Sequence, residues 1–295
     1  MTDLICTTAA TEAGLNQEDL RRLASVARSV AEAGGEELMR HFGRLSSIEN
    51  KGRLGDLVTN ADLAAEQIVL AALKEKTPDL AVLAEESGAA GEQDGLRWCV
   101  DPLDGTTNFA HGYPFFATSI GLTYNHQPIL GAVAIPFLNE TYWGAPGLGA
   151  FCNDASIQVS SCRELEDSLL VTGFAYDRHT RLDNNYAEFC WFTHRTHGVR
   201  RGGAAAVDLA FVAAGRQDGY WERGLAPWDL AAGVALVELA GGRISGYRNE
   251  PFELRSGRVV AAGKALHPAM IEVLAEVKPL PGDAFGAPEI TAMGS

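Results

Sequence analysis

The chain has 295 residues, of which 46% are hydrophobic and 21% charged, and a formal net charge of −14. These values are typical of a soluble globular protein with one large core or two compact halves. A charge this negative excludes a general electrostatic footprint for nucleic acid. It also disfavours an anionic substrate unless local cations offset the field, which favours a metal-assisted site.

The five cysteines are odd in number, widely spaced and free of any C-x-x-C pair. We therefore expect reduced thiols in a cytoplasmic protein rather than disulfides or zinc fingers. The N-terminus shows no secretory signal, and no apolar run of about 18 residues predicts a membrane span. Residues 1–15 and 278–295 lack a regular pattern and are predicted to be flexible tails.

An N-terminal half is predicted over residues 16–158. A helix over 16–42 begins at the N-cap Asn16, and its apolar residues recur on one face. Gly34 and Gly35 either weaken the middle of this helix or mark a close contact. A second helix is predicted over 60–76. Strands are predicted over 80–84, 97–100, 115–124, 128–136, 140–145 and 149–153, and they form a largely antiparallel sheet.

A C-terminal half is predicted over residues 159–277, where helices and strands alternate. The strands are expected over 169–172, 218–222, 243–247 and 258–262. The helices are expected over 184–196, 204–214, 228–240 and 268–277. Such alternation predicts an α/β half packed beside the first, so the fold class is α+β with an α/β portion that completes the site.

Two carboxylates three residues apart are the strongest chemical signal in the chain. The apolar run 98–100 predicts a buried strand, and Pro102 cannot continue a central ladder, so the strand should end near Asp101. Asp101 and Asp104 are then delivered at a strand end, where their oxygens suit a hard cation. Gly105 permits close approach of the backbone to a ligand, and the amides after it suit an anion.

Other acidic residues extend this pattern. Glu85 and Glu86 also follow a strand, and either one would bring a third carboxylate beside the aspartates. Three acids without a cation would repel one another, and the absence of His and Cys favours Mg²⁺ or Mn²⁺ over zinc. Asp229 opens a later helix, either as a fourth acid of the site or as a first-turn acid that complements the helix dipole.

Three polar residues have both an ordinary and a functional interpretation. Thr59 and Asp62 have the spacing of a capping box, yet Asp62 is also suited to orient a water molecule. Lys51 is either a solvated loop lysine or a cation that offsets charge near a phosphate. His111 lies close to the aspartate motif, but we expect it to be a structural or loop histidine.

Three motifs together resemble the inositol monophosphatase family, within the lithium-sensitive, magnesium-dependent phosphatases that include fructose-1,6-bisphosphatase. Residues 84–87 resemble its G-E-E-S segment, with Ala84 in place of Gly. Residues 98–106 resemble W-x-[IV]-D-P-[IL]-D-G-T, and residues 228–233 resemble W-D-x-A-[AG]-G. The resemblance covers roughly residues 16–277 and implies the layered α-β-α-β-α sugar-phosphatase fold.

The resemblance implies a multi-metal site with two to three Mg²⁺ ions, in which Mn²⁺ can substitute and Li⁺ inhibits. Glu85, Asp101 and Asp104 would hold the first metal, together with the backbone carbonyl of Leu103. Asp104 would be shared with a second metal, which Asp229 also binds. A third, weaker magnesium would lie near Glu85.

The resemblance also implies direct attack of water on phosphorus, without a phosphoenzyme. The implied catalytic residues are Thr106, Asp62 and Glu85, of which Thr106 and Asp62 orient and activate the water. The implied substrate-binding residues are Lys51, Gly105, Thr106, Gly203, Ala204, Ala205, Glu222 and Asp229. Within this set the Gly105 and Thr106 amides would hold the phosphate, and the later residues would meet a hydroxyl-bearing ring.

Residues 106–109, Thr-Thr-Asn-Phe, resemble the inositol monophosphatase pattern, so the expected substrate is myo-inositol 1-phosphate. Histidinol phosphate, fructose 1,6-bisphosphate or another small sugar or polyol phosphate is the alternative within the same chemistry. An inactive regulatory homologue is the alternative of a different class. We expect a homodimer, with no nucleic acid and no membrane as partner.

Two local departures bear on the substrate. Ala204 replaces the Thr or Ser that is frequent in the family, so one hydroxyl contact is missing. Arg200, Arg201 and Arg223 are unusual basic residues near the ring-binding positions. They are interpreted here as surface charge in preference to recognition of a second anionic group.

Overall fold

The computed structural model describes residues 4–53, 55–91 and 94–278. The helices are α1 (Ile5–Glu12), α2 (Gln17–His41), α3 (Asn60–Lys76), α4 (Thr106–Ala110), α5 (Tyr186–Thr193), α6 (Ala205–Ala213), α7 (Pro227–Leu239) and α8 (His267–Glu276). The strands are β1 (Ile48–Asn50), β2 (Leu57–Thr59), β3 (Ala81–Ala84), β4 (Gly88–Ala90), β5 (Leu96–Asp104), β6 (Ala117–Tyr124), β7 (Gln127–Ile135), β8 (Glu140–Ala145), β9 (Gly149–Cys152), β10 (Ala155–Ser156), β11 (Leu169–Thr172), β12 (Gly198–Arg200), β13 (Gly219–Arg223), β14 (Gly242–Ser245) and β15 (Arg258–Gly263).

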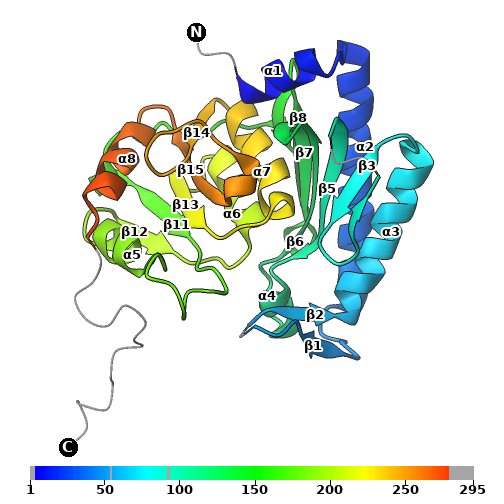
Figure 1. Ribbon diagram of the computed structural model, residues 1–295, viewed down its shortest axis with the longest axis horizontal. Helices are drawn as coiled ribbons and strands as arrows, with labels where there is room; N and C mark the ends of the chain where they lie inside the picture. The colour runs from blue at the N-terminus through cyan, green and yellow to red at the C-terminus, as the bar shows by residue number, and fades with distance from the viewer. Residues whose placement is uncertain (1–3, 54, 92–93, 279–295) are drawn as a thin grey trace, which may run out of the picture.

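Helices and sheets alternate in five layers (Figure 1). Helices α2 and α3 cover one face of an eight-stranded sheet, and α6 and α7 lie between that sheet and a five-stranded sheet. Helices α5 and α8 form the last layer, beside the five-stranded sheet. This is the layered α-β-α-β-α fold that the family resemblance implies. One apolar core lies between the two sheets, around α6 and α7, and a second lies between α2 and the eight-stranded sheet.

The eight-stranded sheet has the order β10-β9-β8-β7-β6-β5-β3-β4. Only β3 and β5 pair in parallel, so the sheet is largely antiparallel, as expected. Strands β5, β6 and β7 are buried along nearly their whole length because helices cover both faces. The carboxyl ends of β3 and β5 consequently lie at the same edge.

The predicted end of β5 near Asp101 is wrong, because the strand continues to Asp104. Its pairing with β6 slips between these residues, with Asp101 opposite Ser119 and Asp104 opposite Ala117. The irregularity accommodates Pro102, which has no N–H to donate, and the carbonyl of Pro102 accepts a hydrogen bond from the Thr118 hydroxyl at 3.0 Å. Both aspartates are thus held in the sheet.

The predicted flexible tail over residues 1–15 is also wrong, because residues 5–12 form helix α1. The backbone N–H groups of Ile5 and Cys6 donate to the carboxylate of Glu238 on α7, at 2.9 and 2.7 Å. These N–H groups have no partner within their own helix, so a distant carboxylate anchors it. The contact spans more than 230 residues of sequence and leaves no local pattern. Residues 279–295 of the other predicted tail lie outside the described residues.

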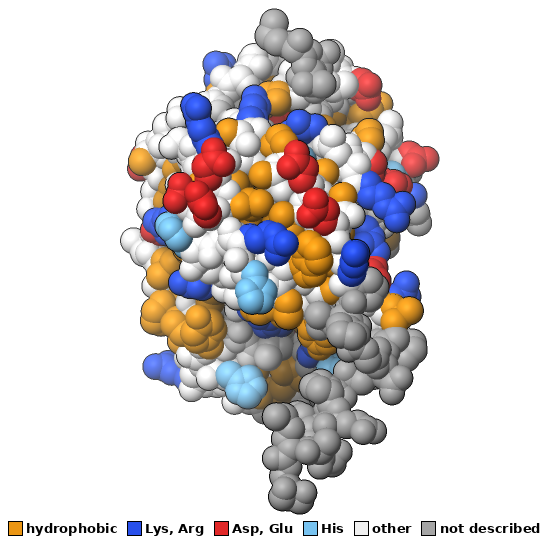
Figure 2. All heavy atoms as spheres, turned by 90° about the vertical axis from the view of Figure 1, so that its left-hand side faces the viewer, with side chains coloured by type: hydrophobic (Ala, Val, Ile, Leu, Met, Phe, Trp, Pro, Cys, Tyr) orange, Lys and Arg blue, Asp and Glu red, His pale blue; other side chains and the backbone are white. Residues whose placement is uncertain are grey.

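The five-stranded sheet has the order β12-β11-β13-β15-β14. Strands β11 and β13 run in parallel, so their carboxyl ends reach the same edge. The face on the side of α5 and α8 carries acidic and basic side chains interspersed, with no single sign of charge dominating it (Figure 2). All five cysteines are free, and no helix in the described ranges is long and apolar enough to cross a membrane.

Candidate active site

A cavity of about 360 Å³ opens where β5, β11 and β13 end, beside the first turns of α6 and α7. This volume suits a small-molecule substrate. Of the predicted site residues, all but Asp62 line it: Lys51, Glu85, Asp101, Leu103, Asp104, Gly105, Thr106, Gly203, Ala204, Ala205, Glu222 and Asp229. The folded chain thus brings together motifs that lie far apart in the sequence.

Negative charge is concentrated in this cavity. Asp101 and Asp104 are only 2% and 6% exposed. Burial raises the pKa of Asp101 well above its usual range, and the charges of Glu85 and Asp104 raise it further. Burial and the charge of Glu85 likewise raise the pKa of Asp229. Buried carboxylates that repel one another in this way are stabilised by a bound cation.

The first turn of α6 binds Asp104. The backbone N–H of Ala205 donates to Oδ1 at 3.0 Å, and those of Ala206 and Val207 donate to Oδ2 at 2.8 and 3.3 Å. These hydrogen bonds oppose the effect of burial, which raises the pKa of Asp104 to about 7. A helix N-terminus therefore orients the aspartate, and in this structure the Ala205 amide serves Asp104.

Thr106 links the cavity to Asp62. Its hydroxyl lies 3.0 Å from both Asp62 Oδ1 and the carbonyl oxygen of Leu103, and its single proton can be donated to either. The other oxygen of Asp62 accepts hydrogen bonds from the amide and hydroxyl of Thr59, at 2.8 and 2.6 Å. Asp62 thus completes the capping box of α3 and contacts Thr106 at the same time. Burial raises the pKa of Asp62, although its hydrogen bonds to Thr59 and Thr106 oppose this.

Lys51 provides a positive charge at one wall of the cavity. Its ammonium group lies 2.9 Å from Oε1 of Glu85 and also contacts Glu86. Burial alone would lower the pKa of Lys51, but the charges of Glu85 and Glu86 outweigh burial and raise it. Lys51 therefore stays cationic beside the acids.

The donor set fits a hard divalent cation. Glu85, Asp101, Asp104 and Asp229 offer only oxygen atoms, which Mg²⁺ and Mn²⁺ prefer over the nitrogen and sulfur donors typical of zinc sites. Within the described ranges, no three His, Cys, Asp or Glu side chains lie close enough together to hold a metal ion as they stand, so metal binding would draw these carboxylates together.

Glu222 lies on the opposite wall, at the end of β13. Its Oε2 accepts a hydrogen bond from the Tyr220 hydroxyl at 2.6 Å. Burial raises the pKa of Glu222 to about 7, although the hydrogen bond from Tyr220 opposes it. A Cβ at Gly173, after β11, would lie 2.3 Å from Oε1 of Glu222, so the carboxylate occupies the space that a side chain at residue 173 would need.

A sequence profile of the inositol monophosphatase family matches residues 19–278. This chain belongs to the inositol monophosphatase family. The inositol-1-monophosphatase of Synechocystis is 49% identical to it over 269 residues, which cover 91% of this chain and 94% of that protein. A solved inositol monophosphatase from Anabaena has a TM-score of 0.82 at 47% identity, and the match covers 89% of this chain and 98% of that one.

Membership of the inositol monophosphatase family makes the protein a metal-dependent phosphoric monoester hydrolase that acts on a phosphorylated substrate. Its relatives do not all carry the same name. A Pseudomonas aeruginosa protein, 39% identical over 262 residues that cover 86% of this chain and 96% of that protein, is named Nus factor SuhB. The substrate must therefore be argued from the site, and the absence of a nucleic-acid partner stays a prediction.

The cavity of this inositol monophosphatase family member contains residues that sequence reasoning missed. Residues 173–176, directly after β11, line it. The available signal was their position directly after β11, whose carboxyl end lies at the same edge as that of β13, which carries Glu222. Arg201, which the sequence analysis interpreted as surface charge, also lines it. The interpretation of Arg223 as surface charge is wrong, since its side chain is 7% exposed and ion-paired. His111 is exposed and does not line the cavity.

Proposed function

We propose that the protein hydrolyses myo-inositol 1-phosphate in the presence of Mg²⁺, by direct attack of water on phosphorus. The observation that carries this proposal is the buried set of carboxylates beside the Thr106–Asp62 pair, in a cavity sized for one small polyol phosphate. No Cys or His side chain lines the described cavity, and the mechanism assigns its residues no nucleophilic role.

Glu85, Asp101, Asp104, Asp229 and the Leu103 carbonyl would hold two to three Mg²⁺ ions. Manganese would substitute, and lithium would inhibit. When bound there, magnesium supplies Lewis-acid chemistry, which lowers the pKa of water and offsets charge on the phosphate and the leaving alkoxide. The raised pKa values of Asp101 and Asp229 support the assignment, because a bound cation offsets both the burial and the repulsion that raise them.

The water is oriented by a relay of hydrogen bonds. When Thr106 donates its proton to Asp62, the hydroxyl oxygen is left as an acceptor for a proton of the attacking water. Glu85, at the same cavity, would accept the second proton. This arrangement would direct an oxygen lone pair of the water toward phosphorus.

The substrate would span the cavity. The Gly105 and Thr106 amides would bind the phosphate, and Lys51 would add a positive charge beside it. The polyol ring would contact the opposite wall, which is formed by Gly203, Ala204, Ala205, Glu222 and Asp229. With a pKa of about 7, Glu222 can accept or donate a hydrogen bond to a ring hydroxyl near neutral pH.

The test is phosphate release from myo-inositol 1-phosphate, measured as initial rates with Mg²⁺, with excess EDTA, and with Mg²⁺ restored. Activity that EDTA does not reduce would contradict the metal assignment. A panel with histidinol phosphate, fructose 1,6-bisphosphate and galactose 1-phosphate, compared by kcat/KM, decides the substrate. A better substrate in that panel would replace inositol phosphate in the proposal.

Fructose 1,6-bisphosphate is a second candidate because of one observation. Arg201 is exposed, lines the cavity and makes no ion pair with any residue that the structure describes, so it is available for a second anionic group. Arg201→Ala should then lower kcat/KM for the bisphosphate about tenfold while sparing monophosphates. The adjacent, exposed Arg200 provides the matched control, Arg200→Ala. Equal effects of Arg201→Ala on both substrate types would exclude this role.

A further inference from the structure

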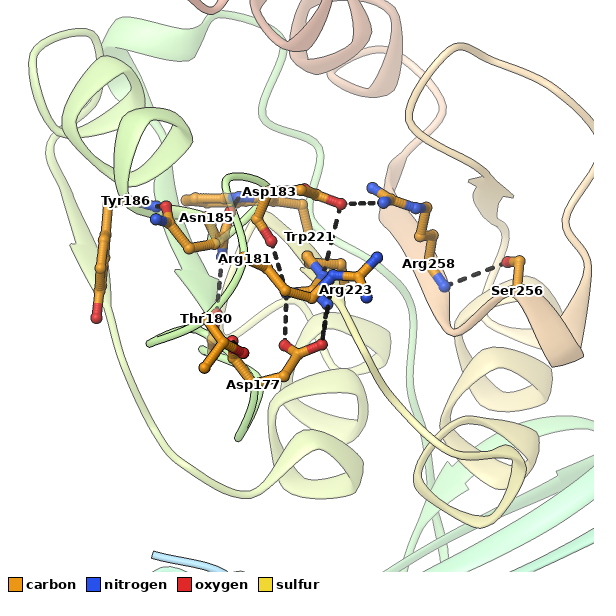
Figure 3. A network of polar contacts seen from close by, with 12 residues as sticks. Asp177, Thr180, Arg181, Asp183, Asn185, Tyr186, Trp221, Arg223, Ser256 and Arg258 are labelled. Carbon is orange, nitrogen blue, oxygen red and sulfur yellow. Dashed lines mark hydrogen bonds and ion pairs between the residues drawn. The ribbon is translucent and has the colours of Figure 1, made fainter. Parts of the chain in front are cut away.

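The segment between β11 and α5, residues 174–184, is a loop with a closed base. Nδ2 of Asn185 donates hydrogen bonds to the Thr172 hydroxyl and the Gly173 carbonyl, both at 2.7 Å. Nε1 of Trp221 donates to Oδ1 of Asn185 at 2.7 Å (Figure 3). The two ends of the loop are therefore fixed to each other and to β13, whatever its middle does.

Arg223, the last residue of β13, holds the middle of this loop. Its Nη1 and Nη2 donate to the two carboxylate oxygens of Asp177, each at 2.8 Å, and Nη1 also donates to the Asp183 carbonyl at 2.6 Å (Figure 3). Arg258 adds an ion pair to the Asp183 carboxylate. Bidentate pairs between Arg and carboxylate fix orientation as well as distance, so the Arg223 guanidinium fixes Asp177 and Asp183, which lie on the two sides of the loop.

Strand β13 connects the Arg223–Asp177 ion pair to the cavity. Successive side chains of a strand point to opposite faces, and Glu222 lines the cavity whereas Arg223 faces the loop. Tyr176, the neighbour of Asp177, lines the cavity and is 44% exposed. A Cβ at Gly55 would lie 3.9 Å from Cε1 of Tyr176, so the ring lies beside Gly55, whose neighbour Asp56 also lines the cavity.

We infer that Arg223 is a positioning residue which, through Asp177, holds Tyr176 across the cavity mouth, where Tyr176 contacts the alcohol part of the substrate. This inference rests on the proposed phosphatase function and adds a specificity-determining contact to it. The phosphate subsite, at Gly105 and Thr106, lies on another element. The selected substrates are therefore bulky cyclic polyol phosphates, whose rings extend from the phosphate to the Tyr176 ring.

Kinetics on the preferred cyclic substrate test the contact. Tyr176→Ala and Asp177→Asn should each raise KM about five- to tenfold, the effect of losing one positioned contact, and change kcat less than twofold. The inhibition constant of inorganic phosphate should stay unchanged, because phosphate alone does not reach Tyr176. Arg181→Ala is the matched control, since Arg181 pairs with the same Asp177 at 3.6 Å but is 60% exposed.

The double variant separates positioning from general damage to the fold. If Asp177 acts through Tyr176, then Asp177→Asn combined with Tyr176→Ala should raise KM no further than Tyr176→Ala alone. Additive effects on KM, or an unchanged KM in either single variant, would overturn the inference. Arg223→Met should raise KM as much as Asp177→Asn does. If Arg223→Met does not fold because this arginine is buried, the result for Asp177→Asn alone tests the inference.

Limited trypsin cleavage tests the Arg223–Asp177 ion pair without measuring turnover. Arg178 and Arg181 are trypsin sites within the loop. Asp177→Asn should accelerate cleavage after these residues at least about fivefold at native temperature, because local opening no longer breaks the ion pair. Cleavage at the wild-type rate would refute the role of this ion pair. A wild-type protein with no phosphatase activity but a normal cleavage difference would instead refute the proposed function.

Discussion

Asp104 is the residue on which most of the site converges. It belongs to β5, accepts three backbone hydrogen bonds from the first turn of α6, and lines the cavity. Its neighbours Asp101 and Glu85 would still bind one cation in its absence. A bridging role, in contrast, needs both of its oxygens and its full charge.

We expect Asp104→Asn to lower kcat by about a thousandfold or more, because the amide removes charge and one acceptor from the ligand that the proposal shares between two cations. Initial rates with Mg²⁺ measure this, with circular dichroism as a check of folding. Glu86→Gln is the control, since Glu86 contacts Lys51 as Glu85 does but does not line the cavity. It should retain at least about a tenth of the activity. Near-normal activity of Asp104→Asn would contradict the proposed role of Asp104 as a metal ligand.

Thr106 allows a sharper test, because its hydroxyl can be removed without changing its shape. Thr106→Val should lower kcat about 10²- to 10³-fold with little change in KM, as expected when water loses an orienting acceptor. Thr106→Ser keeps the hydroxyl and should stay within about tenfold of wild type. Equal losses in the two variants would contradict a specific role of the hydroxyl, because Thr106→Ser keeps it.

Sequence reasoning predicted the acidic residues of the site because each sits in a short motif at the end of an element. Asp101, Asp104 and Glu85 could be predicted from their position at the ends of strands alone, and the structure places all three at one cavity. It failed for Arg223, since burial of an arginine depends on partners 40 and 46 residues away. Tyr176 was missed for the same reason, because a loop position has no periodicity to reveal it.

At the scale of elements, α2 shows why one glycine can matter more than its neighbour. The sequence left open whether Gly34 and Gly35 weaken the helix or mark a close contact. A Cβ at Gly34 would lie 2.7 Å from Cγ2 of Thr118 and 3.0 Å from Cγ2 of Val69. At Gly35 the nearest atom, on Pro136, would be 3.3 Å away. The close contact therefore belongs to Gly34.

Gly34→Ala should lower the free energy of unfolding by about 1–3 kcal/mol, because Thr118 is fully buried and cannot yield. Gly35→Ala should be neutral or stabilising by up to about 1 kcal/mol, since alanine favours the helix and Pro136 needs to move only slightly. Urea unfolding of the two variants and the wild type measures both values. A Gly34→Ala protein as stable as Gly35→Ala would contradict the packing of α2 on β6.

Elements with a strong local pattern were predicted well, and those fixed by distant contacts were not. Helix α2 begins after Asn16, whose side chain accepts hydrogen bonds from Glu18 and Asp19, as the capping signal predicts. Helix α1 instead depends on Glu238, and the extension of β5 past Pro102 depends on its pairing with β6. In both cases the deciding partner lies elsewhere in the chain.

At the scale of the whole molecule, the cavity forms only when both sheets are in place. One wall comes from β5 and the loop after β3, and the other from the ends of β11 and β13. Asp104 joins the two, because it lies on β5 and is held by α6. Metal binding should therefore report on the stability of the complete fold rather than on one half.

The stability of the fold should depend on pH through His267, which is fully buried at the start of α8. Burial lowers the pKa of His267 to about 4, and the charge of Arg243 adds to this effect. Its Nε2 lies 3.0 Å from the Ser245 hydroxyl, whose own proton goes to the Gly246 carbonyl, so the imidazole is the neutral donor. Nδ1 has no hydrogen-bond partner among the described residues, and the backbone of Val260 opposes the lowering of the pKa only in part.

The sign follows from where the proton binds. Below the ordinary histidine pKa of about 6.5, His267 binds a proton in the unfolded chain but not in the folded chain. The stability present above that pH is therefore lost as the pH falls toward 4. The expected loss is about 3 kcal/mol. Other acids titrate too, so the measurement is the difference in unfolding free energy between wild type and His267→Gln, from urea titrations at several pH values. The wild type should lose stability relative to His267→Gln as the pH falls from 6.5 to 4. Curves that stay parallel over this range would show that His267 is protonated in the folded protein.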